Sequence, residues 1–149
     1  MIKVLVKKLN PKAKLPIYKT EGSSGMDLMA LIENPIKIKS QNSALIPTGL
    51  SIAIPEDTEV QIRPRSGLAA KSNISVLNTP GTIDSDYRGE IKIILFNHGN
   101  KEFTVNNNDR IAQMILMPVL KAEFEEVEDL PKSVRGSGGF GSTGKWDKT

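Results

Sequence analysis

The sequence predicts an all-β domain, a sandwich or barrel built from short strands. Most apolar residues lie in short runs, and several runs alternate apolar and polar residues as half-buried strands do. Turn-forming residues separate the runs at short intervals, for example Asn34-Pro35, Pro55-Glu56-Asp57 and the segment 106–109. The chain has 149 residues, enough for one domain with its own core. Regularly spaced short strands with polar turns favour this class over a helical or mixed fold.

The predicted strands follow one another along most of the chain. The first covers residues 2–6 and alternates around Lys3. The others are expected at residues 36–38, 43–47, 50–54, 59–63, 74–77, 91–97, 103–105 and 110–120.

One stretch differs from this pattern. Residues 66–71, Ser-Gly-Leu-Ala-Ala-Lys, contain helix formers and follow a predicted strand. A serine at the start of a helix accepts a backbone N–H, so Ser66 is the expected N-cap. The sequence therefore predicts one short helix within the β domain.

The composition changes after Pro131. Residues 135–144 read Arg-Gly-Ser-Gly-Gly-Phe-Gly-Ser-Thr-Gly, a run that cannot bury a core. A disordered tail is one interpretation. The other is a flexible segment that folds over a ligand, which the single phenylalanine and the leading arginine favour. Composition alone leaves both interpretations open and divides the chain into a β-barrel domain over residues 1–131 and a flexible, glycine-rich segment over residues 132–149.

Composition excludes several classes of function. The chain has no cysteine, which excludes disulfides and thiol catalysis. Its net charge of +3 is mild and its aromatic content is 5%, so no nucleic-acid partner is expected. No apolar run approaches the roughly 20 residues that cross a bilayer, and lysines interrupt the N-terminal run, so neither a membrane partner nor a signal peptide is expected. These features predict a cytoplasmic protein, or one inside a nucleus or an infected host cell, that is not secreted.

The segment from Gly81 to Glu90 is the first candidate site. It resembles a β-hairpin whose tip carries Asp84, Asp86 and the ring of Tyr87. Asp and Gly are also common in ordinary turns, so the segment alone leaves both interpretations open.

Three further segments have a polar character that suits an anionic ligand. Residues 63–67 place two arginines before a serine and a glycine at the expected helix start, a combination that binds phosphate. Gln113 lies inside an apolar run and needs a polar partner if buried, and Asn108 suits a left-handed turn before it. Asp27 could hold the water shell of a magnesium ion or could stabilise a turn. Each also has a purely structural interpretation, and His98 is expected to be a solvated loop residue.

Taken in order, these segments and the glycine-rich tail resemble the five motifs of the trimeric dUTP diphosphatase (dUTPase) family. The matches are Ser24 to Leu28, Pro64 to Ala69, Ile83 to Gly89, Asp109 to Gln113 and Arg135 to Gly144. The resemblance implies a jelly-roll β fold and a homotrimer with shared active sites at subunit interfaces. It also implies hydrolysis of dUTP to dUMP and pyrophosphate with Mg²⁺ as cofactor, by in-line attack of water at the α-phosphorus.

The resemblance also implies a role for individual residues. Asp84 would be the general base that activates the water, and Tyr87 would pack on the deoxyribose and exclude a 2′-hydroxyl. Asp27 would support the magnesium-bound triphosphate through water. The residues expected to bind substrate are Arg65, Ser66, Gly67, Asn78, Gly81, Ile83, Tyr87, Gln113, Arg135, Phe140, Gly141, Ser142 and Thr143.

The sequence departs from the family pattern at two positions. Met26 stands where an aromatic or small residue is frequent, and Asn108 stands where glycine is usual.

Three other functions are alternatives to dUTP hydrolysis. dCTP deaminases share the fold but carry a catalytic glutamate where this chain has Ile94, which cannot move protons. A regulatory nucleotide-binding module would retain the pocket and lose the base, whereas Asp84 is present. A purely structural β domain would not need the motifs.

Overall fold

The structure is a computed structural model that describes residues 2–139, and within them it contains eleven strands and one short helix. The predicted all-β class is therefore confirmed. The elements in chain order are β1 (Leu5–Lys8), β2 (Met26–Met29), β3 (Ile36–Ile38), β4 (Ser43–Pro47), β5 (Leu50–Ala53), β6 (Thr58–Arg63), α1 (Ser66–Ser72), β7 (Ile74–Val76), β8 (Gly81–Ile83), β9 (Lys92–Asn97), β10 (Phe103–Val105) and β11 (Arg110–Pro118).

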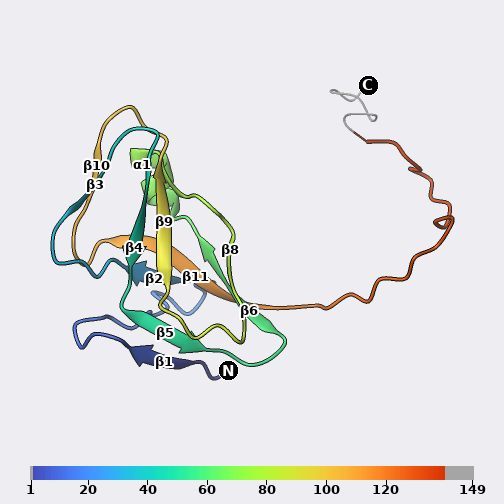
Figure 1. Cartoon of the computed structure of the whole chain (residues 1–149), viewed down its shortest axis with the longest axis horizontal. Helices are drawn as coiled ribbons and strands as arrows, with labels where there is room; N and C mark the ends of the chain where they lie inside the picture. The colour runs from blue at the N-terminus through green and yellow to red at the C-terminus, as the bar shows by residue number, and fades with distance from the viewer. Residues whose placement is uncertain (1, 140–149) are drawn as a thin grey trace.

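Two antiparallel sheets enclose the core in a jelly-roll-like arrangement (Figure 1). The larger sheet has the strand order β2-β11-β6-β8, and the smaller has the order β4-β9-β7. Two short pairs, β1 with β5 and β3 with β10, complete the body. Leu28 and Val60 from the larger sheet and Ile46, Ile93 and Leu95 from the smaller one belong to a single buried cluster. The two sheets therefore share one hydrophobic core.

Period-two alternation explains how the central strands form. In β6, Val60 and Ile62 point into the core, while the polar residues between them are only partly buried. In β9, Ile93 and Leu95 point into the core, but Ile94 between them is also apolar and half-buried. The smaller sheet is therefore apolar on both faces, and its outer face exposes Leu45 on β4. Such a face is unusual for a strand that meets only water.

Several strand predictions are refined by the pairing. The strand expected at residues 2–6 begins three residues later, at Leu5, where pairing with β5 starts. β2 and β8 are strands of only four and three residues that the apolar pattern does not reveal, and pairing with β11 and β6 fixes them.

The prediction of a β-hairpin from Gly81 onward is wrong. β8 pairs with β6 in the larger sheet, whereas β9 pairs with β4 and β7 in the smaller sheet. The segment between them is therefore a turn that crosses from one sheet to the other. The local sequence predicts a turn between two strands, but it does not determine which other strands they pair with.

The helix is where the sequence places it, but its cap differs. Arg65 is the N-cap, with an extended backbone and no side-chain cap hydrogen bond, and Ser66 is the first helical residue. The prediction that Ser66 caps the helix is therefore wrong. The Arg65 carbonyl accepts the N–H groups of Leu68 and Ala69 at 3.1 and 3.0 Å, so the helix begins one residue earlier than the serine rule suggests. Asn73 ends the helix in the left-handed conformation, with φ of 54°.

After β11, the chain leaves the body and runs as an extended segment away from both sheets (Figure 1). Within the described part of this segment there is no strand or helix. Leu120 and Phe124 are 96% and 95% exposed. The described part of the chain therefore leaves these large apolar side chains uncovered.

Candidate functional site

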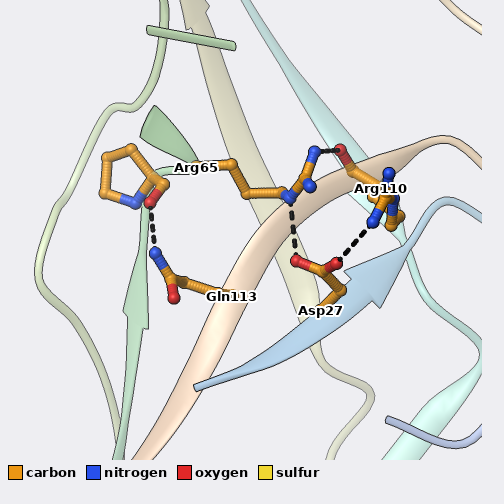
Figure 2. A network of polar contacts seen from close by, with 5 residues as sticks. Asp27, Arg65, Arg110 and Gln113 are labelled. Atoms are coloured by element: carbon orange, nitrogen blue, oxygen red, sulfur yellow. Dashed lines mark hydrogen bonds and ion pairs between the residues drawn. The ribbon is translucent and has the colours of Figure 1, made fainter. Parts of the chain in front are cut away.

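A polar network at one edge of the larger sheet joins three of the candidate segments (Figure 2). The Asp27 Oδ1 atom accepts a hydrogen bond from Arg65 Nε at 2.8 Å, and Oδ2 accepts one from Arg110 Nη1 at 3.2 Å. Arg65 Nη1 also donates to the Arg110 carbonyl at 3.3 Å. One carboxylate therefore holds two guanidinium groups from distant parts of the sequence.

Strand register brings these side chains together. Asp27 on β2 lies opposite Gln113 on β11, and Gln113 lies opposite Arg63 on β6, so the 27, 63–65 and 113 segments are neighbours. The Asp27 side chain is only 14% exposed. A carboxylate with so little solvent is stable as an ion only beside positive charge and hydrogen-bond donors. The network is therefore a structural element as well as a candidate anion site.

Gln113 has the polar partner that its position requires. Its Nε2 donates to the Pro64 carbonyl at 2.9 Å, just before helix α1. Gly25 lies directly beneath the amide, because a Cβ atom at Gly25 would come to 2.6 Å from Gln113 Oε1. The absent side chain thus leaves the space that the glutamine occupies. Ser66 and Gly67 lie nearby at the start of α1 and are exposed.

A pocket of about 180 Å³ opens between β6, β7, β8 and β9. Its apolar wall includes Ile62, Val76 and Ile93, and its polar lining combines candidate residues with Thr82, Glu90 and Lys92. The sequence-predicted residues that line it are Asn78, Gly81, Ile83, Asp84 and Tyr87. Ile94, the apolar residue at the position where dCTP deaminases are expected to carry a glutamate, is also among the lining residues.

The tip of the turn that carries Asp84 and Tyr87 is held by hydrogen bonds among its own residues. The Tyr87 N–H donates to the Asp84 carbonyl at 3.1 Å, and the Tyr87 hydroxyl donates to the Glu90 carbonyl at 3.0 Å. Arg88 Nη1 donates to the Ser85 and Tyr87 carbonyls at 2.7 and 2.8 Å. Asp84 is exposed at the pocket rim, and among residues 2–139 its carboxylate has no hydrogen-bond or ion-pair partner.

The predicted residues therefore fall into two clusters and one segment. One cluster is the pocket with Asn78, Gly81, Ile83, Asp84 and Tyr87. The other contains Asp27, Arg65 and Gln113, none of which lines that pocket. Arg135 lies in the extended C-terminal segment, where its Nε donates to the Gly138 carbonyl at 2.7 Å. Phe140, Gly141, Ser142 and Thr143 lie outside the described residues.

Sequence reasoning missed three residues of this region. Arg110 was named only as part of a motif, yet it binds Asp27 directly. Glu90 anchors the crossing turn, since its Oε1 accepts the Gly49 N–H at 2.9 Å. Gly25 provides the space for Gln113. Only Arg110 offered a signal, as a charged residue at the start of an apolar strand; the other two contacts join segments far apart in the sequence.

His98 lies on the loop between β9 and β10. His98 is exposed as expected, but its Nε2 pairs with Ser75 Oγ at 2.7 Å and its ring packs against Phe96.

In the described part of the chain, no group of three or more His, Cys, Asp or Glu side chains is arranged to hold a metal ion. Between residues 2 and 139 no helix is both long enough and apolar enough to span a bilayer.

Comparison with known proteins identifies the family. The dUTPase family model matches residues 11–144. The deoxyuridine 5′-triphosphate nucleotidohydrolase of Fusobacterium nucleatum is 53% identical over 97% of this chain and 100% of its own length. The enzyme of the same name from Treponema denticola is 55% identical over 92% of this chain and 95% of its own.

Solved structures agree in fold. The dUTPase of Staphylococcus bacteriophage 80alpha, solved with dUpNHpp, superposes with a TM-score of 0.86 at 24% identity, covering 95% of this chain and 98% of the phage chain. A dUTPase from phage phi11 of S. aureus, described with a structural Mg(II) ion, gives a TM-score of 0.78 at 20% identity and covers 87% of this chain and 99% of its own. The match to the family model and the close relatives extend over nearly the whole sequence. The chain therefore belongs to the dUTPase family of dUTP-hydrolysing enzymes.

Proposed function

We propose that this chain hydrolyses dUTP to dUMP and pyrophosphate by in-line attack of water at the α-phosphorus, with Asp84 as the general base. The observation that carries the proposal is the position of the Asp84 carboxylate, exposed on the rim of a partly apolar pocket and without a protein partner among the described residues. A base in such a place is available to accept a proton from water, which is worth roughly 10²- to 10⁴-fold in rate.

The size of the pocket suits one part of the nucleotide. Sites that enclose a drug-sized ligand occupy about 300–1,000 Å³, whereas this pocket occupies about 180 Å³. We infer that it holds the uracil and the sugar, with Asn78 and the backbone near Gly81 and Ile83 at the base and Tyr87 at the deoxyribose. The triphosphate then extends beyond the pocket.

The second cluster suits the phosphates. Arg65, Ser66, Gly67 and Gln113 combine a guanidinium, a hydroxyl and an amide around the start of α1, and arginine binds phosphate oxygens in a bidentate manner. Asp27 holds Arg65 by its Nε and the Arg110 carbonyl accepts from its Nη1, which fixes the guanidinium while the other N–H groups of Nη1 and Nη2 stay available. In this arrangement Asp27 is a positioning residue for the phosphate-binding side chain.

A homotrimer would combine the two clusters into one site. The pocket contains no residue of the phosphate cluster, so each site is proposed to take them from different copies of the chain. Two surfaces support assembly: the outer apolar face of the smaller sheet, with Leu45 and Leu77, and the C-terminal segment with Leu120 and Phe124. Each exposes large apolar side chains that self-association would cover.

Magnesium fits this site as an ion carried mainly by the substrate. Both oxygens of Asp27 already bind arginine, and the described residues contain no cluster of metal ligands. This donor set suits Mg²⁺, which keeps several waters and usually binds one or two carboxylates together with substrate phosphates. When bound, Mg²⁺ would neutralise charge on the leaving pyrophosphate. Asp27 would contact its water shell through the lone pairs that the arginines leave open.

We further propose that residues 1–131 form the β-barrel domain and residues 132–149 a lid. Closure would exclude water and align the phosphates. Phe140 would cover the uracil, while Arg135, Gly141, Ser142 and Thr143 would contact the phosphates.

One experiment tests the activity against its rivals. Pyrophosphate and ammonia release are measured over dUTP, dCTP, dTTP and UTP, with and without Mg²⁺. The proposal expects much faster pyrophosphate release from dUTP than from the other three nucleotides, a further increase with Mg²⁺, and no ammonia. Ammonia from dCTP would establish a deaminase, and binding of dUTP without pyrophosphate release would establish a regulatory module.

A further inference from the structure

The ring of Tyr87 is held in place although nearly half of it is exposed to solvent. The residue is 45% exposed, and one edge of it lines the pocket. Its hydroxyl donates to the Glu90 carbonyl at 3.0 Å, so the ring folds back over the chain that follows it. An exposed tyrosine without such contacts would sample several rotamers. Its position therefore depends on what lies beneath the ring.

Gly89 lies beneath the Tyr87 ring. A Cβ atom at Gly89 would overlap the Tyr87 hydroxyl oxygen and would stand 2.5 Å from Cζ and 2.8 Å from Cε2. The backbone at Gly89 is not in the left-handed region, so an alanine would meet no conformational strain there. The ring alone accounts for the absence of a side chain.

The backbone around Gly89 cannot move easily to relieve such an overlap. Ser51 is buried, and its Oγ donates to the Arg88 carbonyl at 2.7 Å. On the other side, the Gly49 N–H donates to Glu90 Oε1 at 2.9 Å, and the Ile91 N–H donates to the Leu50 carbonyl at 2.8 Å. Both neighbours of Gly89 are thus tied to β5 and the turn before it. A methyl group at position 89 would displace the ring and leave the backbone in place.

We propose that Gly89 is a positioning residue that sets the place of the Tyr87 ring and so determines how strictly the enzyme rejects ribonucleotides. This inference rests on the proposed function for the sugar contact of Tyr87. A ring that sits on Gly89 and is tied to Glu90 presents a fixed edge to the sugar. A displaced ring presents no fixed edge, so the space beside the 2′ carbon is no longer closed.

The central variant is Gly89→Ala, assayed with dUTP and UTP. We expect kcat/KM for dUTP to fall between about tenfold and a hundredfold, as for a small misplacement of a contacting group. The ratio of kcat/KM for dUTP over UTP should also fall, while thermal stability stays unchanged. Gly22→Ala is the matched control, since nothing lies within 4 Å of the Cβ position at Gly22.

A double-mutant cycle separates this role from a general structural one. If Gly89 acts through the ring, Gly89→Ala has no further effect on the dUTP/UTP ratio in a Tyr87→Ala background. Tyr87→Phe retains the ring and removes only the tie to Glu90, so it should lower the ratio by less than Gly89→Ala does. An equal loss from Gly89→Ala in the presence and absence of the ring would overturn the proposal.

The position of the ring can be measured without any activity. The chain has two tyrosines, Tyr18 and Tyr87, so labelled ring signals are assigned with Tyr87→Phe. Gly89→Ala should shift the Tyr87 signals and leave those of Tyr18 unchanged. Unshifted Tyr87 signals would overturn the seating of the ring. Wild-type protein that releases no pyrophosphate from dUTP would instead overturn the proposed function, and the ring signals would still decide whether Gly89 seats the ring.

Discussion

The two clusters of candidate residues are built in opposite ways. The Asp27 network joins side chains that are 38 and 83 residues apart in sequence, and its carboxylate is nearly buried. The tip of the turn, with Asp84 and Tyr87, is exposed and is held by hydrogen bonds between residues one to three positions apart. Only the end of the turn, at Arg88 and Glu90, is tied to β5 and the turn before it. The first cluster is therefore coupled to the packing of the sheet, whereas the tip of the turn is coupled mainly to itself.

This difference separates stability from chemistry. A change in the Asp27 network should lower the free energy of unfolding together with activity, because it leaves a partly buried charge without its partner. A change at the exposed turn should alter turnover or selectivity and leave stability almost unchanged. Single substitutions in the two clusters can test whether stability and activity are affected separately.

The largest effect is expected at Asp84. Asp84→Asn removes the proposed base and retains the size of the side chain, so turnover should fall at least about a hundredfold while dUTP still binds. Stability should not change, since the carboxylate has no partner among the described residues. Single-turnover kinetics and dUTP binding measure the two parts. Asp86→Asn, also exposed in the same turn, is the control, and near-normal turnover in Asp84→Asn would exclude the assignment.

The next effect is a loss of stability at Asp27. Asp27→Ala leaves Arg65, whose side chain is 25% exposed, without its carboxylate. Breaking a buried ion pair costs about 3–5 kcal/mol, and because both arginines retain some solvent we expect about 2 kcal/mol here. Urea unfolding measures the change. Glu102→Ala is the matched control, because it removes a carboxylate from an exposed ion pair with Lys37 and should have little effect. Equal stability for the two variants would contradict the separation of the clusters.

The same contrast explains how much of the molecule the sequence predicts. Alternation places the strands at residues 36–38, 43–47 and 103–105 with the same bounds as the structure, because their periodicity is local. It misses β2 and β8, which exist because neighbouring strands pair with them. The crossing turn was predicted as a hairpin for the same reason, since pairing partners are a property of the whole fold.

The candidate site follows this rule as well. Motif residues such as Asp84 and Gln113 stand out by their type and their neighbours in sequence, and both lie where substrate contacts are proposed. Glu90 and Gly25 act through contacts with segments far along the chain, so no local pattern reveals them. Asn108 is an intermediate case: asparagine in place of the usual glycine predicts a left-handed turn, and the structure confirms it with φ of 66°.

Truncation of the C-terminal segment should lower activity without lowering stability. A chain that ends at Arg135 lacks the proposed lid over the site. Turnover should fall by about tenfold or more, since water is no longer excluded and the phosphates are less well aligned. The proposed homotrimer should persist, as measured by light scattering. A chain that ends at Gly144 retains the whole fifth motif and is the control. Full activity in the shorter chain would show that residues 136–149 form no lid.

The smallest effect is expected at Gly25, and it compares the two clusters directly. Gly25 lies under Gln113 as Gly89 lies under Tyr87, but Ile115 Cγ1 and the Met114 carbonyl also lie 3.1 and 3.4 Å from its Cβ position. Because these atoms belong to a central strand, Gly25→Ala should displace the Gln113 amide and break its hydrogen bond to Pro64, at a cost of about 1 kcal/mol. Stability and kcat/KM for dUTP should then fall together, while selectivity against UTP stays unchanged. Gly89→Ala should give the reverse pattern, a loss of selectivity with stability retained. If both alanine variants lowered stability alike, the exposed turn would be coupled to the sheet as strongly as the Asp27 network is.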